Sequence, residues 1–222
     1  MKKVLCVLMA ISLLFVSCGN HLLDTSEFEK DYTLLDTSGM DMYTEIIESL
    51  TSGEILFEYS ANSSVAPKVQ FKTLDNGEKE IVATINRPDY KNINYFDGEN
   101  LYLVENNEAR MVDGKTIEKD VLYRNYLGAP EDAINSDAIV EDSVYLKKDN
   151  SEYVIVIETD YQDEGKMKLA FYLDSAKTPK YMKIYSTYYD EKGKEKIDII
   201  TMTYSKLGEE ITISAPEFTI VE

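Results

Sequence analysis

The side chains that most often carry covalent or metal chemistry are scarce in this sequence of 222 residues, which holds two cysteines and one histidine. Cys6 lies inside an apolar run near the amino terminus, Cys18 follows that run, and His21 comes three residues later. Serine and cysteine nucleophiles need a neighbouring base, usually an imidazole, and zinc sites are built mainly from histidine and cysteine. The sequence therefore predicts a protein that is not an enzyme and that holds no metal or cofactor.

Carboxylates are the remaining candidates for chemistry, because glycoside hydrolysis needs only two of them. With 41 acidic residues, no pair stands out, and a hydrolase that uses carboxylates alone stays open as a minor alternative. Asp160, Gln162 and Glu164 resemble the opening of a calcium-binding loop. The twelfth position of such a loop, counted from Asp160, is Phe171, which offers no oxygen ligand. We therefore predict a charged hairpin turn there.

The amino terminus has the pattern of a bacterial lipoprotein leader. Lys2 and Lys3 precede an apolar run, residues 4–16, which is too short to span a bilayer and suits a signal peptide. A small residue then precedes Cys18, as at the sites where lipoproteins are acylated and cut. We predict a signal peptide over 1–17 and lipid, palmitate included, on Cys18. The alternatives are an ordinary secretory leader and an uncleaved anchor.

Charge limits the partners of the remaining chain. Removing residues 1–17 takes away two lysines and no acid, which leaves 21 basic and 41 acidic side chains, a net charge of about −20. Such a surface repels nucleic acid and anionic lipid headgroups. We therefore expect no nucleic-acid partner, and membrane contact only through lipid on Cys18. The location is predicted to be outside the cytoplasm, anchored to the bacterial cell membrane, with any protein partner left unknown.

The rest of the chain divides into a tether and one domain. Residues 18–37 are polar without apolar periodicity, which predicts a tether, and residues 38–222 are predicted to form a single domain. The domain opens with a helix whose apolar residues recur at helical spacing, with Gly53 expected just after its end. A helical segment over 116–128 and a second short helix from residue 130 are also predicted. The apolar positions of the first helix are Met42, Ile46, Ile47 and Leu50.

Alternating apolar residues predict about 11 strands, joined by turns such as the Asn-Gly pair at 76–77. Several strands are apolar on both faces, so we expect the sheet to curl and to be covered on one side. The predicted class is mainly β (α+β): a single curved antiparallel sheet or half-barrel with two or three covering helices. The predicted strands are 55–60, 68–73, 81–85, 101–104, 111–112, 143–148, 152–159, 166–173, 180–189, 196–206 and 211–215.

One stretch, residues 83–112, carries a family resemblance. Arg87-Pro88, Asp97-Gly98, Leu101-Tyr102 and Met111-Val112 follow one another as in LolA-like lipoprotein carriers, which place a further strand between the first two pairs. The ending 211–217 resembles lipid-anchored relatives of the LppX/LprG type. The resemblance implies a curved half-barrel closed by helices around an apolar cavity that binds acyl chains. Because the carrier itself has no lipid anchor, Cys18 points to the anchored relatives.

The functional hypothesis is a membrane-anchored lipoprotein of the cell envelope whose half-barrel cavity binds an acyl chain or another hydrophobic molecule. The alternative is a non-enzymatic interaction or sensor module with a filled core and no ligand. Side chains two apart on a strand share a face, and a curled sheet gathers such faces around one space. On that ground the cavity is predicted to be lined by Ile55, Phe57, Val69, Phe71, Ile81, Ile155, Ile157, Phe171 and Ile199.

Overall fold

The computed structural model describes residues 28–59, 67–86, 91–128, 138–160, 165–190 and 192–221. Several predictions fall outside these ranges and stay predictions. They are the leader with Cys18 and His21, the Arg87-Pro88 pair, the short helix from residue 130, and the centre of the turn at 161–164.

The described residues form one open, curved sheet of 13 strands. All neighbouring strands are antiparallel except β13 and β7, which are parallel. The antiparallel prediction is thus confirmed, and the strand number is 13 rather than about 11. In chain order the strands are β1 Tyr32–Asp36, β2 Ser52–Tyr59, β3 Lys68–Thr73, β4 Lys79–Asn86, β5 Lys91–Phe96, β6 Leu101–Glu105, β7 Glu108–Val112, β8 Ile139–Lys147, β9 Glu152–Asp160, β10 Lys166–Asp174, β11 Pro179–Tyr189, β12 Glu195–Ser205 and β13 Thr219–Ile220.

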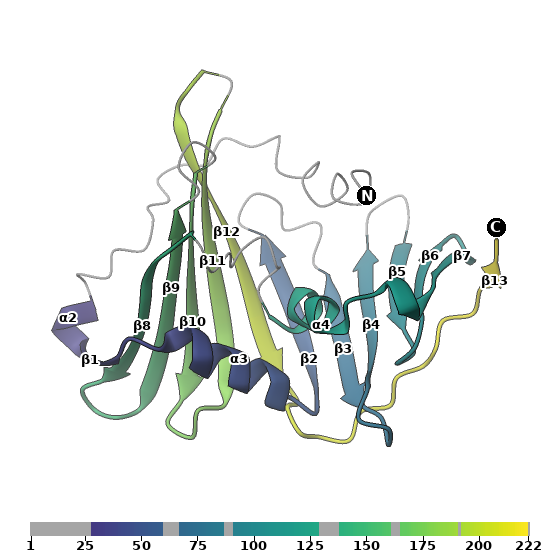
Figure 1. Ribbon diagram of the computed structural model, residues 1–222, viewed down its shortest axis with the longest axis horizontal. Coiled ribbons are helices and arrows are strands. Elements are labelled where there is room, and N and C mark those ends of the chain that lie inside the picture. Colours follow the sequence, from purple (N-terminus) through teal and green to yellow (C-terminus); the bar gives the residue numbers. More distant parts are fainter. Residues whose placement is uncertain are drawn as a thin grey trace.

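Two meanders lie side by side in this sheet. One runs from β2 to β7 and the other from β8 to β12, and they join where β12 pairs with β2 (Figure 1). The amino-terminal β1 is added outside β8, and the carboxy-terminal β13 is added outside β7. Both chain ends of the described fold therefore lie at the edges of the sheet.

Three strands were not predicted from the residue pattern, and one predicted strand is wrong. β5 carries Asn92 and Asn94, whose type is depleted in strands, and only the family resemblance implied it. β1 and the short helix α2, Phe28–Asp31, lie inside the segment expected to be a tether. Residues 211–215 form no strand, although the two-residue β13 follows further on.

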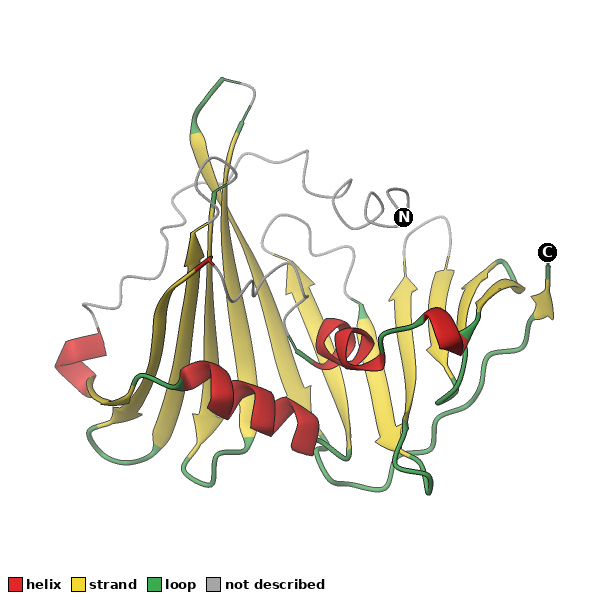
Figure 2. Cartoon of the chain, in the orientation of Figure 1, coloured by secondary structure: helices red, strands yellow, loops and turns green. Residues whose placement is uncertain are grey.

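In the described part of the chain, two helices cover one face of the sheet, which we call the inner face (Figures 1 and 2). α3, Gly39–Ser49, confirms the predicted amphipathic helix. α4, Lys119–Leu127, lies within the predicted helical segment and follows a single 3-10 turn at Gly114–Thr116. We call α3 and α4 the cover helices. Gly53 does not follow the end of α3, because it lies within β2.

Gly53 serves close packing instead of helix termination. A side chain at this position would meet Leu207 and the ring of Phe71, which lies directly opposite on β3. The turn prediction at Asn76-Gly77 is confirmed: Gly77 has φ +88°, a left-handed conformation that glycine adopts without strain. Within the described residues, no helix is long and apolar enough to cross a bilayer.

Candidate functional site

The inner face carries a continuous apolar floor. Strand pairing aligns its side chains in rows that run across the strands, because residues directly opposite each other share a face. One row crosses six strands from β8 to β2, and the other crosses six from β2 to β7. The rows are Val144, Ile155, Phe171, Met182, Met202 and Phe57, and then Gly53, Phe71, Ile81, Phe96, Leu101 and Val112.

Eight of the nine predicted cavity residues lie together on this floor. Each is at most 8% exposed, and all eight belong to the same buried cluster. They are Ile55, Phe57, Val69, Phe71, Ile81, Ile155, Ile157 and Phe171. The structure therefore brings these side chains together; that they line a ligand site remains a proposal.

Ile199 lies on the opposite, outer face of the sheet, so its prediction as a lining residue is wrong. It pairs with Tyr185 and packs against the outer-face cluster. The side chains of β12 that lie on the inner face include Ile200 and Met202. Two adjacent isoleucines made the face ambiguous, and a shift of one residue moves a whole strand's set to the other side. Met202 and Tyr204, which alternate with polar residues, mark the inner face of this strand more clearly.

α3 fills the space above one half of the floor. Tyr43 is 1% exposed and meets the Phe171 ring edge-on, with centroids 5.8 Å apart. Its hydroxyl lies against Gly128, just beyond α4, where an added side chain would collide with it. In the first turn of α3, the Met40 amide donates to Asp142 Oδ1 on β8 at 2.7 Å. Tyr43 therefore links both cover helices to the floor.

α4 is fixed at its two ends. At the first turn Lys119 pairs with Glu78 at 2.6 Å, and the Tyr123 hydroxyl donates to the same carboxylate at 2.7 Å. Burial and that hydrogen bond raise the pKa of Tyr123 to about 12. At the last turn the Tyr204 hydroxyl donates to the Leu127 carbonyl at 2.9 Å. Burial raises the pKa of Tyr204 well above that of free tyrosine, so both phenols are neutral at physiological pH.

Lys79 joins the two cover helices at the edge of the floor. Its ammonium donates to the Leu50 carbonyl, which follows the last turn of α3. It also lies 5.8 Å from the centre of the Tyr123 ring on α4. The side chain is 7% exposed, and burial lowers the pKa of its ammonium. No residue pattern predicts this contact, because Lys79 follows a turn and has the sequence context of a surface charge.

The outer face carries two apolar clusters separated by a charged band. The first lies over β8 to β11 and is rich in tyrosine, with Tyr172 and Tyr181 stacked at 4.3 Å. The second lies over β4 to β6, where the carboxy-terminal segment packs against it. Between them Glu54 forms ion pairs with Lys68 at 3.0 Å and with Lys206 at 3.3 Å. The expectation of apolar residues on both strand faces is therefore confirmed.

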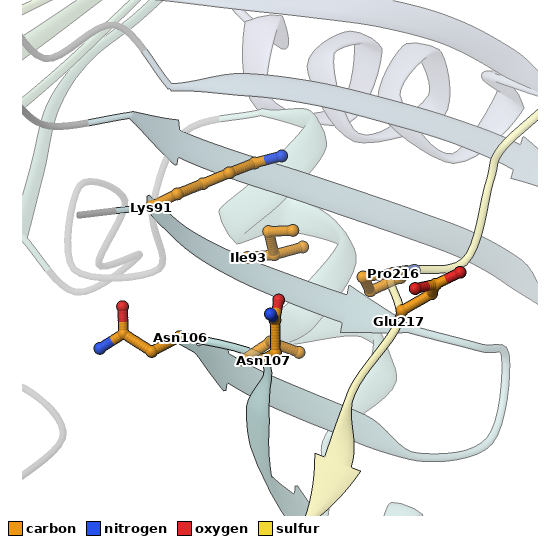
Figure 3. A pocket seen from close by; sticks show the side chains of 7 residues that line it. Lys91, Ile93, Asn106, Asn107, Pro216 and Glu217 are labelled. Atoms are coloured by element: carbon orange, nitrogen blue, oxygen red, sulfur yellow. The ribbon is translucent and has the colours of Figure 1, made fainter.

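A hollow of about 390 Å³ opens on the outer face beside the second cluster (Figure 3). Its lining comes from β5, from β6 and the turn that follows it, and from the carboxy-terminal segment. A lysine, a glutamate and two asparagine amides surround two branched apolar side chains. The lining residues are Lys91, Ile93, Val104, Asn106, Asn107, Pro216 and Glu217.

These features are an apolar surface on the inner face and a mixed polar hollow on the outer face. In the part of the chain that the structure describes, no three acidic, cysteine or histidine side chains are grouped as metal ligands. The inner floor is apolar, so it can hold hydrocarbon, whereas the outer hollow offers mixed polar contacts. Sequence reasoning found most of the floor but missed Tyr43, Lys79, Met182 and Met202, which close or complete it.

Comparison with known proteins gives limited likenesses. No protein-family model and no curated protein matches the chain. Similar solved structures include a MucA/MucB complex of Pseudomonas aeruginosa, 11% identical with a TM-score of 0.39 over 77% of this chain and 55% of the matched one. MucB in complex with MucA(peri) is 10% identical, with a TM-score of 0.41 over 83% of this chain and 61% of the other.

A LolA superfamily protein, NE2245 of Nitrosomonas europaea, is also among the structural neighbours. It is 10% identical with a TM-score of 0.33, over 80% of this chain and 96% of the other. The chain spans only 55% and 61% of the two chains matched in the MucB complexes. Likenesses with TM-scores below 0.5 do not assign a family, so the description of the fold rests on the strand order given above.

Proposed function

We propose that the chain is a non-enzymatic binding module held outside the cytoplasm by lipid on Cys18. Its ligand is an acyl chain or another apolar envelope molecule, which lies on the inner floor. The observation that supports this is the continuous apolar floor, which runs across the strands from β8 to β7 and which, among the described residues, two short helices cover. Such a surface binds hydrocarbon by burial alone and needs no charged contact.

The floor is closed in this structure, so the ligand must take the place of helix side chains. An open cavity would leave its walls accessible to water, whereas the eight lining residues are 0 to 8% exposed. The cover helices bury four side chains there, worth about 1.5–3 kcal/mol each, or about 6–12 kcal/mol together. An acyl chain of about 15 methylenes would contribute about 12 kcal/mol. The free energy of replacing the helix side chains with the ligand is therefore close to zero. The four are Tyr43, Ile47, Leu122 and Leu127.

This balance predicts that Tyr43→Ala strengthens acyl binding. The substitution removes a ring that the ligand has to displace and leaves space above Phe171. We expect the dissociation constant of a fluorescent fatty acid to fall about 10-fold, equivalent to about 1.4 kcal/mol. The measurement is a titration of the full chain stripped of bound lipid. Tyr189→Ala, at a position 60% exposed, is the matched control and should leave binding unchanged.

The alternative function is an interaction or sensor module with a filled core, and the same burial of the floor favours it. Exposed apolar side chains at the β1 and β8 edge, Leu34, Leu35 and Val140, would then be part of a partner surface. The titration separates the two functions. If neither the unmodified chain nor Tyr43→Ala takes up micromolar probe saturably, the acyl-binding proposal fails and the interaction module replaces it.

The anchor gives a separate prediction. Cys18→Ser should abolish acylation and release the protein from membranes, because the acidic remainder of the chain is repelled by anionic headgroups. One acyl chain binds a bilayer only marginally, and two give stable attachment. Fractionation of cells with a high-salt wash measures the effect. Retention of the Cys18→Ser protein in the pellet would mean that residues 1–17 act as an uncleaved anchor.

A further inference from the structure

The carboxy-terminal residues 206–221, which we call the strap, cross the outer face of the sheet. The strap leaves the end of β12, passes over β4 to β6, and ends as β13 beside β7 (Figure 1). Phe218 packs on Tyr102 with ring centres 5.0 Å apart, and Tyr102 stacks on Tyr95 at 5.9 Å. Ile211 and Ile213 join the same cluster, together with Val82 and Ile93.

The strap is held along its length by side chains and at its ends by backbone hydrogen bonds. Near its start the Gly208 amide donates to the Ser52 carbonyl at 3.1 Å. Near its end the Thr219 and Val221 amides donate to the carbonyls of Asn107 and Ala109 on the β7 side, both at 2.9 Å. Residues 210–218 have no regular structure. An extended segment with apolar anchors and a short pairing at a sheet edge is how many domains bind peptides.

The strap does not fill the surface that it covers. The hollow of about 390 Å³ lies where Pro216 and Glu217 cross β5 and β6 (Figure 3). Ile93 and Val104, which face each other across these strands, form its apolar part. A volume of this size falls at the lower end of the range for ligand pockets. Beneath the strap's short proline ring Ile93 is only partly buried, whereas Val104 is 5% exposed.

We propose that the outer face of β4 to β7 is a docking site for an extended peptide of a partner protein, occupied here by the chain's own strap. The partner peptide carries branched aliphatic residues two apart and an aromatic residue five further on, as Ile211, Ile213 and Phe218 do. It also carries a larger apolar side chain in place of Pro216. A second copy's strap has the same sequence and leaves the same hollow, so a different protein is the better occupant.

The competition with the strap sets the affinity that the partner needs. A segment tethered to its site acts at an effective concentration in the millimolar range, so a free peptide without extra contacts is excluded. Burying a leucine side chain in the hollow would strengthen binding about 10- to 100-fold. This site lies on the face opposite the acyl floor, so either proposal can fail without the other.

The test uses the full chain and three fluorescein-labelled peptides, measured by fluorescence anisotropy. The peptides have the sequence of residues 210–221, the same sequence with Pro216→Leu, and a scrambled order. Phe218→Ala in the chain loosens its own strap, with folding checked by circular dichroism. In that background we expect the Pro216→Leu peptide to bind at least about 10-fold tighter than the native sequence. The scrambled peptide should not bind.

Two outer-face tyrosines provide the matched pair of groove variants. Tyr102→Ala removes the ring against which Phe218 packs, and it should weaken binding of the Pro216→Leu peptide about 10-fold. Tyr181→Ala, in the other outer cluster, should not change it. Absence of saturable binding to the Phe218→Ala chain, or equal affinity of the Pro216→Leu and native-sequence peptides, overturns the proposal. So does a dimer, seen by light scattering, that the peptide dissociates, because a second copy would then be the occupant.

Discussion

Phe171→Ala is expected to lower the free energy of unfolding by about 3–5 kcal/mol, the range for removing a buried aromatic side chain from a packed core. Phe171 is 0% exposed and lies near the middle of the longer-stranded half of the inner floor. Its ring meets Tyr43 of α3 at 5.8 Å and Tyr204 of β12 at 5.5 Å. Removing it therefore leaves a cavity between the sheet and α3. Equilibrium urea denaturation measures the loss.

The same variant distinguishes a packed floor from a ligand cavity wall. Tyr189→Ala is the control, and an exposed substitution of this kind should change stability by less than about 0.5 kcal/mol. A wall residue of an open cavity has fewer packing partners, so its loss would cost noticeably less and would alter ligand retention instead. A loss below about 1 kcal/mol would contradict the packing of Phe171 against Tyr43 and Tyr204.

Local patterns predicted the elements well, because strand alternation and helix periodicity depend on neighbours in the sequence. The ends of β9 to β12 were predicted to within one residue, whereas β8 begins four residues earlier than predicted. The helix α3 was also predicted. Patterns failed where local residues disagree with their environment. β5 alternates asparagines with apolar residues, and its polar positions gave no strand signal. Ile211 and Ile213 suggested a strand, yet they serve as anchors of an extended strap.

Long-range contacts decided the parts of the candidate site that could not be predicted. The pairing of β12 with β2 joins two strands more than a hundred residues apart and so unites the two meanders, and no local signal encodes it. The same holds for the closing of the floor by Tyr43 and for the burial of Lys79 between two helices. Ile199 shows the limit most clearly, because two adjacent isoleucines fit either face until a partner strand fixes the register.

Lys168 is a further case in which sequence position misleads. It follows a charged turn and reads as one of several surface lysines, but its side chain is 5% exposed on the outer face. Its ammonium pairs with Glu158 at 2.8 Å and Glu141 at 3.0 Å. Burial works to lower the pKa of Lys168, but the hydrogen bonds that its ammonium donates to the two carboxylates outweigh burial and raise the pKa overall. The ammonium is therefore charged at neutral pH and balances two partly buried carboxylates.

Lys168→Met is accordingly expected to destabilise the fold by about 3–5 kcal/mol, because it leaves Glu141 and Glu158 partly buried and facing each other without a cation. Neutralising the acids removes that penalty, so the triple variant Lys168→Met, Glu141→Gln, Glu158→Gln should recover to within about 1 kcal/mol of the unmodified protein. Urea denaturation at neutral pH measures both variants. A cost below about 1 kcal/mol for Lys168→Met alone, the range of exposed ion pairs, would contradict the burial of this cluster.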